Sequence, residues 1–138
     1  MNSVDAQKFL DAQDKVWPQV VRELNQGEKT SHWIWYVFPQ LASLGRSERA
    51  RRYGIADLAE AKAYLDNPML RERLEEVAEL LLMHRGWSPE DILGPVDALK
   101  VRSSMTLFSR VDGAPEVFEK ILDVFYDGER CAESDAAS

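Results

Sequence analysis

The sequence predicts an all-α fold, a compact single-domain bundle of about seven helices. Three observations predict it. Apolar residues recur at helical spacing along most of the 138 residues. Residues that typically begin and end helices stand at the borders of these periodic stretches. No Asn-Gly or Asp-Gly turn joins two alternating apolar–polar stretches, as a β-hairpin would require.

Two helices are expected at the N-terminus. Residues 5–13 form the first, with Phe9 and Leu10 facing inward. Pro18 is typical of a first helical position and begins the second, which runs to residue 26 and ends at Gly27.

Residues 29–40, KTSHWIWYVFPQ, hold two of the four tryptophans together with a tyrosine and a phenylalanine. As a helix this stretch begins at Thr30 or Ser31 and ends before Pro39. It is apolar nearly all round, which is typical of a helix at the centre of a domain.

The next helices are marked by capping residues. Ser47 begins a short arginine-rich helix, and Asp57 begins a second one. The clearest helix covers residues 67–86, with Asn67 as its cap and Pro68 at its first position. Ser88 and Pro89 begin one more short turn of helix.

Two helices are expected before the C-terminus. Residues 95–111 read as a helix that buries Leu99, Met105 and Phe108, and a last helix follows Pro115. Residues 33–38 and 101–108 are the stretches in which a minor β element could form instead. A single helical domain is expected over residues 1–126, followed by a disordered acidic tail over residues 127–138.

Composition excludes several classes of protein. The net charge of −7 disfavours bulk nucleic-acid binding and attachment to a membrane surface. With no apolar run long enough for a bilayer, no signal peptide and one cysteine, Cys131, a cytoplasmic protein is expected. No cofactor and no metal site is expected, because no Cys/His spacing suggests zinc and no phosphate-loop or dinucleotide motif is present.

Three polar clusters are candidates for a site. In the aromatic stretch, His32, Trp35 and Tyr36 share one helical face, which would offer flat walls and few polar groups to a planar ligand. Lys100 stands three and four residues before Ser103 and Ser104, a spacing that allows a nucleophile–base pair on a helix. A helix with a solvated lysine and small packing serines is the plainer interpretation.

The third cluster is the arginine-rich stretch GRSERARR. A surface helix with solvated charges is the plainer interpretation, and an anion such as phosphate near Ser47 is the alternative.

The motifs SHWIWYVFPQLASLGRS, EAKAYLDNPMLRERL and ILGPVDALKVRSSMTLF resemble an uncharacterised, mostly bacterial domain family. Its members are sometimes labelled calpastatin, although no calpain-inhibitory repeat is present. The resemblance implies a compact helical fold and no established activity. The order of elements is more distantly similar to the YbiA-like (NADAR) proteins, which cleave N-glycosidic bonds of ADP-ribose-type and riboside intermediates.

Two functions are therefore expected as alternatives. The first is hydrolysis of an N-glycosidic bond in a nucleotide-like or ADP-ribosyl ligand, with His32, Asp97 and Lys100 as catalytic candidates. The second is a non-catalytic module that binds a small anionic ligand or a protein. The residues expected to bind the ligand are Ser31, Trp35, Tyr36, Gln40, Arg46, Arg49, Arg52, Arg102, Ser103, Ser104 and Thr106.

Overall fold

A computed structural model describes residues 5–138, so the first four residues of the expected domain lie outside the described part. Over that part the fold is all-α, as predicted, with ten α-helices, one 3-10 helix and no strand. The helices are α1 (Ala6–Asp14), α2 (Trp17–Gln26), α3 (Ile34–Val37), α4 (Glu48–Arg52), α5 (Leu58–Asp66), α6 (Pro68–Leu82), α7 (Pro89–Leu93), α8 (Pro95–Ser109), α9 (Val117–Tyr126) and α10 (Ala132–Asp135), with η1 at Ala42–Leu44. The count exceeds about seven because several of them are single turns.

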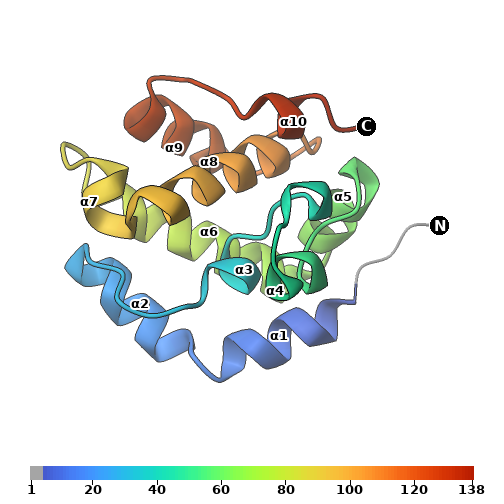
Figure 1. Ribbon diagram of the computed structural model, residues 1–138, viewed down its shortest axis with the longest axis horizontal. Helices are drawn as coiled ribbons and strands as arrows, with labels where there is room; N and C mark the ends of the chain where they lie inside the picture. The colour runs from blue at the N-terminus through green and yellow to red at the C-terminus, as the bar shows by residue number, and fades with distance from the viewer. Residues whose placement is uncertain (1–4) are drawn as a thin grey trace.

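Helix α6 runs through the middle of the bundle (Figure 1). Helices α8 and α9 pack together above it in this view, and α1 and α2 cross below it. The inward stripe of α6 is nearly inaccessible to solvent, and its members are Leu70, Leu74, Val77, Ala78 and Leu81. This stripe joins the two halves of the core.

The predicted helix caps are confirmed at four positions. Ser47 Oγ accepts a hydrogen bond from the backbone N–H of Ala50, and Asp57 accepts one from Glu60. Asn67 caps α6 directly before Pro68, and Ser88 caps α7. These side chains satisfy backbone donors that a helix leaves free in its first turn.

The helix predicted in residues 29–40 is much shorter than expected. It has only the four residues of α3, and its cap position is Trp33 rather than Thr30 or Ser31. The reason is tertiary: the carboxylate of Glu23 binds the backbone N–H groups of Thr30 and Ser31, which holds these residues outside a helix. Pro39 follows the end of α3, as expected.

Neither of the possible β stretches is a strand. Residues 34–37 form α3, and residues 101–108 lie inside the long helix α8. Residues 103–108 of α8 are all buried, so its small Ser103, Ser104 and Thr106 allow close packing against neighbouring helices. The one isolated β-bridge within the described part joins Leu41 to Ile55 instead. Leu99, expected inside, is 56% exposed.

The expected disordered tail is ordered in this structure. It contains α10, which packs on α8, and it buries Cys131 and Ser134. The guanidinium of Arg110 donates hydrogen bonds to the backbone oxygens of Ser134 and Ala137. The small polar composition of the segment concealed these contacts, because they are made by backbone atoms.

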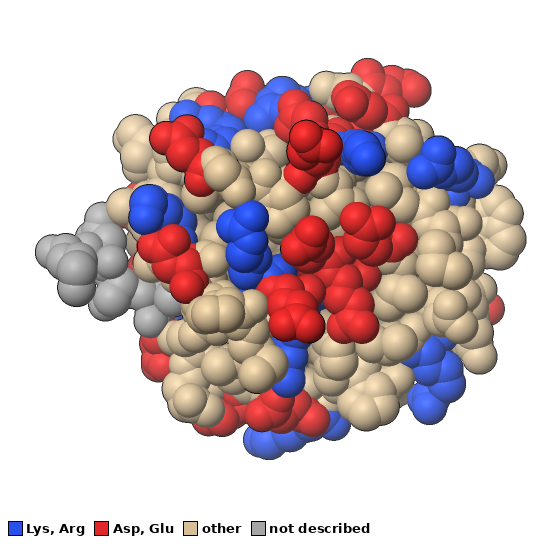
Figure 2. Space-filling model, turned by 180° about the vertical axis from the view of Figure 1, so that it is seen from behind, with Lys and Arg blue, Asp and Glu red and all other residues tan. Residues whose placement is uncertain are grey.

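Charges of both signs cover the surface, with acidic groups in excess. Figure 2 shows acidic side chains gathered near the centre of one face, with lysines and arginines distributed around them. Within residues 5–138 no helix combines the length and the apolar character needed to cross a membrane.

Candidate functional site

The short helix α4 lies between two pockets. Residues Ser47 and Ala50 point to one side of it, while Arg49, Arg52 and Tyr53 point to the other. This division follows from helical geometry, because residues three and four apart share a face. The Ser47 cap begins α4, and Tyr53 packs at its end against the ring of Phe9 at 5.7 Å between centroids.

The first pocket, which we call the two-tyrosine pocket, has a volume of about 470 Å³ and lies between α1, α3 and α4. Tyr36 and Tyr53 line it, and their rings meet edge to face at 5.2 Å. Burial, and Tyr53 beside it, raise the pKa of Tyr36, while Arg49 acts in the opposite direction. The two tyrosines thus place their phenol rings side by side at the wall of the pocket.

Four cations line the same pocket. Lys8 and Lys15 come from α1 and its C-terminal end, and Arg49 and Arg52 come from α4. None of the four makes an ion pair with a described carboxylate, and Asp11 is the single acidic residue among the lining side chains. In a chain of net charge −7, this is a local concentration of positive charge.

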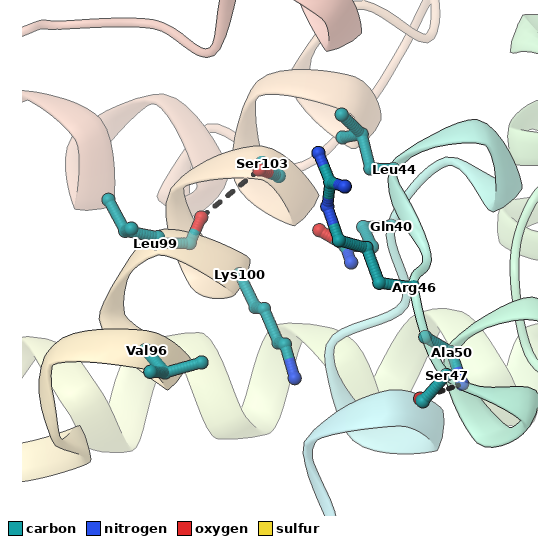
Figure 3. Close-up of a pocket in the computed structure, with 9 residues that line it drawn as sticks. All are labelled: Gln40, Leu44, Arg46, Ser47, Ala50, Val96, Leu99, Lys100 and Ser103. Atoms are coloured by element: carbon teal, nitrogen blue, oxygen red, sulfur yellow. Dashed lines mark hydrogen bonds between the residues drawn. The ribbon is translucent and has the colours of Figure 1, made fainter.

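The second pocket, which we call the α4–α8 pocket, has a volume of about 370 Å³. In Figure 3, Val96, Leu99, Lys100 and Ser103 come from α8, whereas the opposite wall comes from the segment between α3 and α4 and from α4 itself. That wall consists of Gln40, Leu44, Arg46, Ser47 and Ala50. The pocket thus combines two cations with aliphatic side chains and contains no aromatic residue.

Trp35 lies between a residue of each pocket. The guanidinium of Arg49 lies 5.2 Å from the centre of its ring, and the ammonium of Lys100 lies 5.4 Å from it. Both distances are in the range of cation–π attraction. Trp35 lines neither pocket, so the flat wall expected from this residue is used to hold two cations.

The serines on α8 do not form a nucleophile–base pair with Lys100. The hydroxyl of Ser103 donates to the backbone oxygen of Leu99 at 3.1 Å and lies 3.4 Å from the sulfur of Cys131. Ser104 and Thr106 are completely buried, and the Thr106 hydroxyl donates to the backbone oxygen of Arg102 at 2.8 Å. Arg102 itself pairs with Glu129 at 3.2 Å. Ser103 lines the α4–α8 pocket, whereas Ser104, Thr106 and Arg102 line none of the described pockets.

His32 is exposed and lies in a third pocket of about 310 Å³, together with Ser31 and Asp97. Asp97 pairs there with Lys29 at 2.7 Å and stands 3.9 Å from Lys100. The three catalytic candidates are therefore not brought to one cavity, since His32 and Asp97 line this pocket and Lys100 lines the α4–α8 pocket.

Two charged residues that organise this region were not predicted. Glu23 is 3% exposed, and its carboxylate accepts hydrogen bonds from the N–H groups of Thr30 and Ser31 and from the Trp33 indole. Burial alone would raise the pKa of Glu23, but hydrogen bonds from residues 30, 31 and 33 outweigh it and hold the pKa at about 2. A sequence signal existed, because Glu23 stands three residues after Val20 on the apolar face of α2.

Lys29 is the second of these residues. Its side chain is 5% exposed, and its ammonium contacts Asp97, the backbone oxygen of Ser31 and the face of the Trp33 ring at 4.8 Å. It thereby ties the loop before α3 to the first turn of α8. Nothing in the local sequence distinguishes Lys29 from a solvated lysine.

No group of three or more His, Cys, Asp and Glu side chains in the described part of the chain is arranged to hold a metal ion. The site is therefore described by its cations, its two tyrosines and its aliphatic walls.

Fold and pockets together define a small all-α domain in which basic side chains gather on both sides of one short helix. The chain belongs to the DUF1810 family, described as proteins of unknown function, whose profile matches residues 3–137. This confirms the expected membership of an uncharacterised family. No curated protein matches the chain.

A crystal structure supports the fold. The chain is similar to the conserved hypothetical protein Rv1873 from Mycobacterium tuberculosis, with 45% sequence identity and a TM-score of 0.92. The similarity covers 96% of this chain and 94% of that one. The more distant similarity to YbiA-like proteins stays a prediction.

Proposed function

We propose that this domain binds a nucleotide-like ligand in the two-tyrosine pocket. The observation that carries the proposal is the convergence of four cations, without carboxylate partners, around two tyrosine rings. Arginine and lysine are the side chains that recognise phosphate groups, and arginine does so with two parallel hydrogen bonds.

The arrangement of the cations suits a chain of phosphates. Lys8 and Lys15 are seven residues apart, so they lie on one side of α1 two turns from each other. Arg49 and Arg52 are neighbours on α4. A ligand between the two elements would be contacted by cations from both, while a planar ring would pack against Tyr36 or Tyr53.

We assign binding and not turnover to this pocket. The catalytic candidates predicted from the sequence, His32, Asp97 and Lys100, line other pockets. Hydrolysis of an N-glycosidic bond needs an acid or base within hydrogen-bond reach of the reacting atoms. The non-catalytic alternative is therefore the function that this geometry supports best.

Titration calorimetry with ATP, pyrophosphate and adenosine tests the proposal on the full chain. We expect ATP and pyrophosphate to bind and adenosine to bind much more weakly, because the cations recognise the phosphates. Arg52→Gln and Lys8→Gln should each weaken ATP binding by up to about 1 kcal/mol, the value of an exposed ion pair. Raising the salt concentration should weaken binding further.

Arg51→Gln is the matched control, since Arg51 is a neighbouring arginine of α4 that lines none of the pockets described above. An equal loss of ATP affinity in Arg51→Gln and Arg52→Gln would mean diffuse attraction and no site. Absence of ATP binding to the wild-type protein would refute the proposal. In a separate assay, ATP and ADP-ribose are each incubated with the protein. Chromatography of the two mixtures then checks that neither compound is cleaved.

A further inference from the structure

The α4–α8 pocket, which takes no part in the proposed nucleotide site, exposes aliphatic side chains to solvent. Val96 and Leu99 are 63% and 56% exposed, although each is an aliphatic residue on a helix whose other apolar residues are buried. They stand in successive turns of α8, and both line this pocket, as does Leu44 on the opposite wall (Figure 3). The pocket therefore presents aliphatic surface to solvent.

Two cations border this aliphatic surface. Arg46 is exposed and forms no ion pair with a described carboxylate. Lys100 is held over the Trp35 ring. Its nearest carboxylate oxygen is Oδ1 of Asp97, 3.9 Å away, whereas Oδ2 of Asp97 binds Lys29 at 2.7 Å. Arg46 has no described carboxylate partner, and Lys100 has only the long contact with Asp97, which Lys29 shares; the two cations reach the pocket from opposite walls.

The remaining polar groups set the character of the site. Gln40 contributes an amide that can donate or accept a hydrogen bond, whereas the hydroxyls of Ser47 and Ser103 are engaged with Ala50 and Leu99. No carboxylate lines the pocket; the Asp97 carboxylate lies 3.9 Å from the Lys100 ammonium and is also paired with Lys29. No aromatic ring lines the pocket either, so it offers no surface on which a nucleobase could stack.

We propose that the α4–α8 pocket is a separate binding site for a small aliphatic anion. The negative group would lie between Arg46 and Lys100, with Gln40 as a hydrogen-bond partner. The hydrocarbon part would cover Leu44, Val96 and Leu99, whose exposure to water is otherwise unfavourable. A pocket of about 370 Å³ is of the size that holds small organic ligands.

This site is independent of the proposed function. The two pockets share no lining residue, and α4 stands between them. Failure of one proposal consequently leaves the other intact, and variants of each pocket report separately.

NMR chemical-shift titration of the full chain tests the inference with three probes of matched length: hexanoate, hexyl phosphate and hexanamide. Both anions should shift resonances of α8 and of residues 40–50, and comparison of the two distinguishes a carboxylate from a phosphate ester as the preferred group. Hexanamide lacks the charge and should bind up to about fivefold more weakly, as expected for loss of an exposed ion pair.

Two variants locate the contacts. Lys100→Gln should weaken the binding of the preferred anion about fivefold, and Leu99→Asp should abolish it, because the new carboxylate both repels the anion and removes aliphatic surface. Leu99 is exposed, so the second change leaves the core intact. Lys62→Gln is the control, since Lys62 is a lysine on α5 that pairs with Asp66 away from the pocket.

Three results would overturn the inference. They are equal affinity for hexanamide and the anions, an equal effect of Lys62→Gln and Lys100→Gln, and no shift with either anion at high millimolar concentration. Competition of ATP with hexanoate would also overturn it, because it would place both ligands in one pocket. Loss of ATP binding in Lys100→Gln would likewise show that ATP and the aliphatic anion share one pocket, and it would overturn the inference.

Discussion

The carboxylate of Glu23 accepts a hydrogen bond from the indole Nε1 of Trp33 at 3.0 Å inside the core. The same oxygen accepts hydrogen bonds from the backbone N–H groups of Thr30 and Ser31, at 2.8 and 3.1 Å. One side chain of α2 thus determines the path of the loop that precedes α3. Tyr36, which lines the two-tyrosine pocket, lies on that helix.

Replacing Glu23 by alanine should lower the free energy of unfolding by about 2–4 kcal/mol. Three N–H donors lose a charged acceptor, and hydrogen bonds to charged groups are worth about 1.5–3 kcal/mol each before the remaining groups adjust. Urea unfolding measures the change. Glu76→Ala is the control, because Glu76 accepts a hydrogen bond from the indole of Trp17 at an exposed position. Similar losses in the two variants would show that burial of Glu23 is unimportant.

Glu23 should also contribute to the pH dependence of stability. The pKa of Glu23 is about 2 in the folded protein, against an ordinary value of 4.5. The folded state therefore favours the ionised carboxylate more than the unfolded chain does. This stabilisation is complete above pH 4.5 and is lost as the pH falls toward about 2. Over that window stability should fall less steeply in Glu23→Gln than in the wild type. Identical slopes in acid unfolding curves would contradict the prediction.

Lys29 and Asp97 form the most buried ion pair of the described residues, with side chains 5% and 19% exposed. Lys29→Met should destabilise the protein by up to about 3 kcal/mol, because Asp97 loses its close partner in a poorly solvated place and keeps only the longer contact with Lys100. Adding Asp97→Leu should recover part of the loss. In contrast, Lys62→Met, which breaks the exposed pair with Asp66, should change stability by no more than about 0.5 kcal/mol. Thermal and urea unfolding of the wild type and the three variants give the comparison.

Deleting residues 129–138 should destabilise the protein by at least about 2 kcal/mol. The deletion removes the acceptors of Arg110 and the N–H that Cys131 donates to the buried hydroxyl of Thr106, and it exposes part of α8. A disordered tail would be removed without effect. Arg130→Gln, which breaks the ion pairs with Glu119 and Asp135 and a hydrogen bond to the Ser109 hydroxyl but leaves α10 in place, should cost no more than about 1 kcal/mol.

The parts of the fold that were predictable depend on neighbouring residues. Ser47, Asp57, Asn67 and Ser88 cap helices because a side-chain oxygen reaches a backbone N–H two or three residues ahead. The inward stripe of α6 follows from apolar spacing alone. The extent of α3 was not predictable in this way, because it depends on Glu23, a buried residue of the preceding helix α2 whose carboxylate binds the loop between the two helices.

The candidate site shows the same division. The arginines on α4, Tyr36 and Lys100 were identified as candidates from their types and spacing. The fold does not place them in one pocket, because Arg49, Arg52 and Tyr36 line the two-tyrosine pocket and Lys100 lines the α4–α8 pocket. Arg49 and Arg52 face Lys8 and Lys15, two lysines that no local pattern distinguishes. His32 lies in another pocket.

The sequence by itself determined that this protein is all-α, where its capped helices begin, and that its basic residues concentrate near α4. These properties arise from contacts within one or two helical turns. Only the tertiary structure decided which cations share a pocket, that Trp35 lies between Arg49 and Lys100, and that the C-terminal segment is ordered. Those outcomes depend on packing between helices far apart in the chain, where one buried carboxylate or lysine changes the path of a loop.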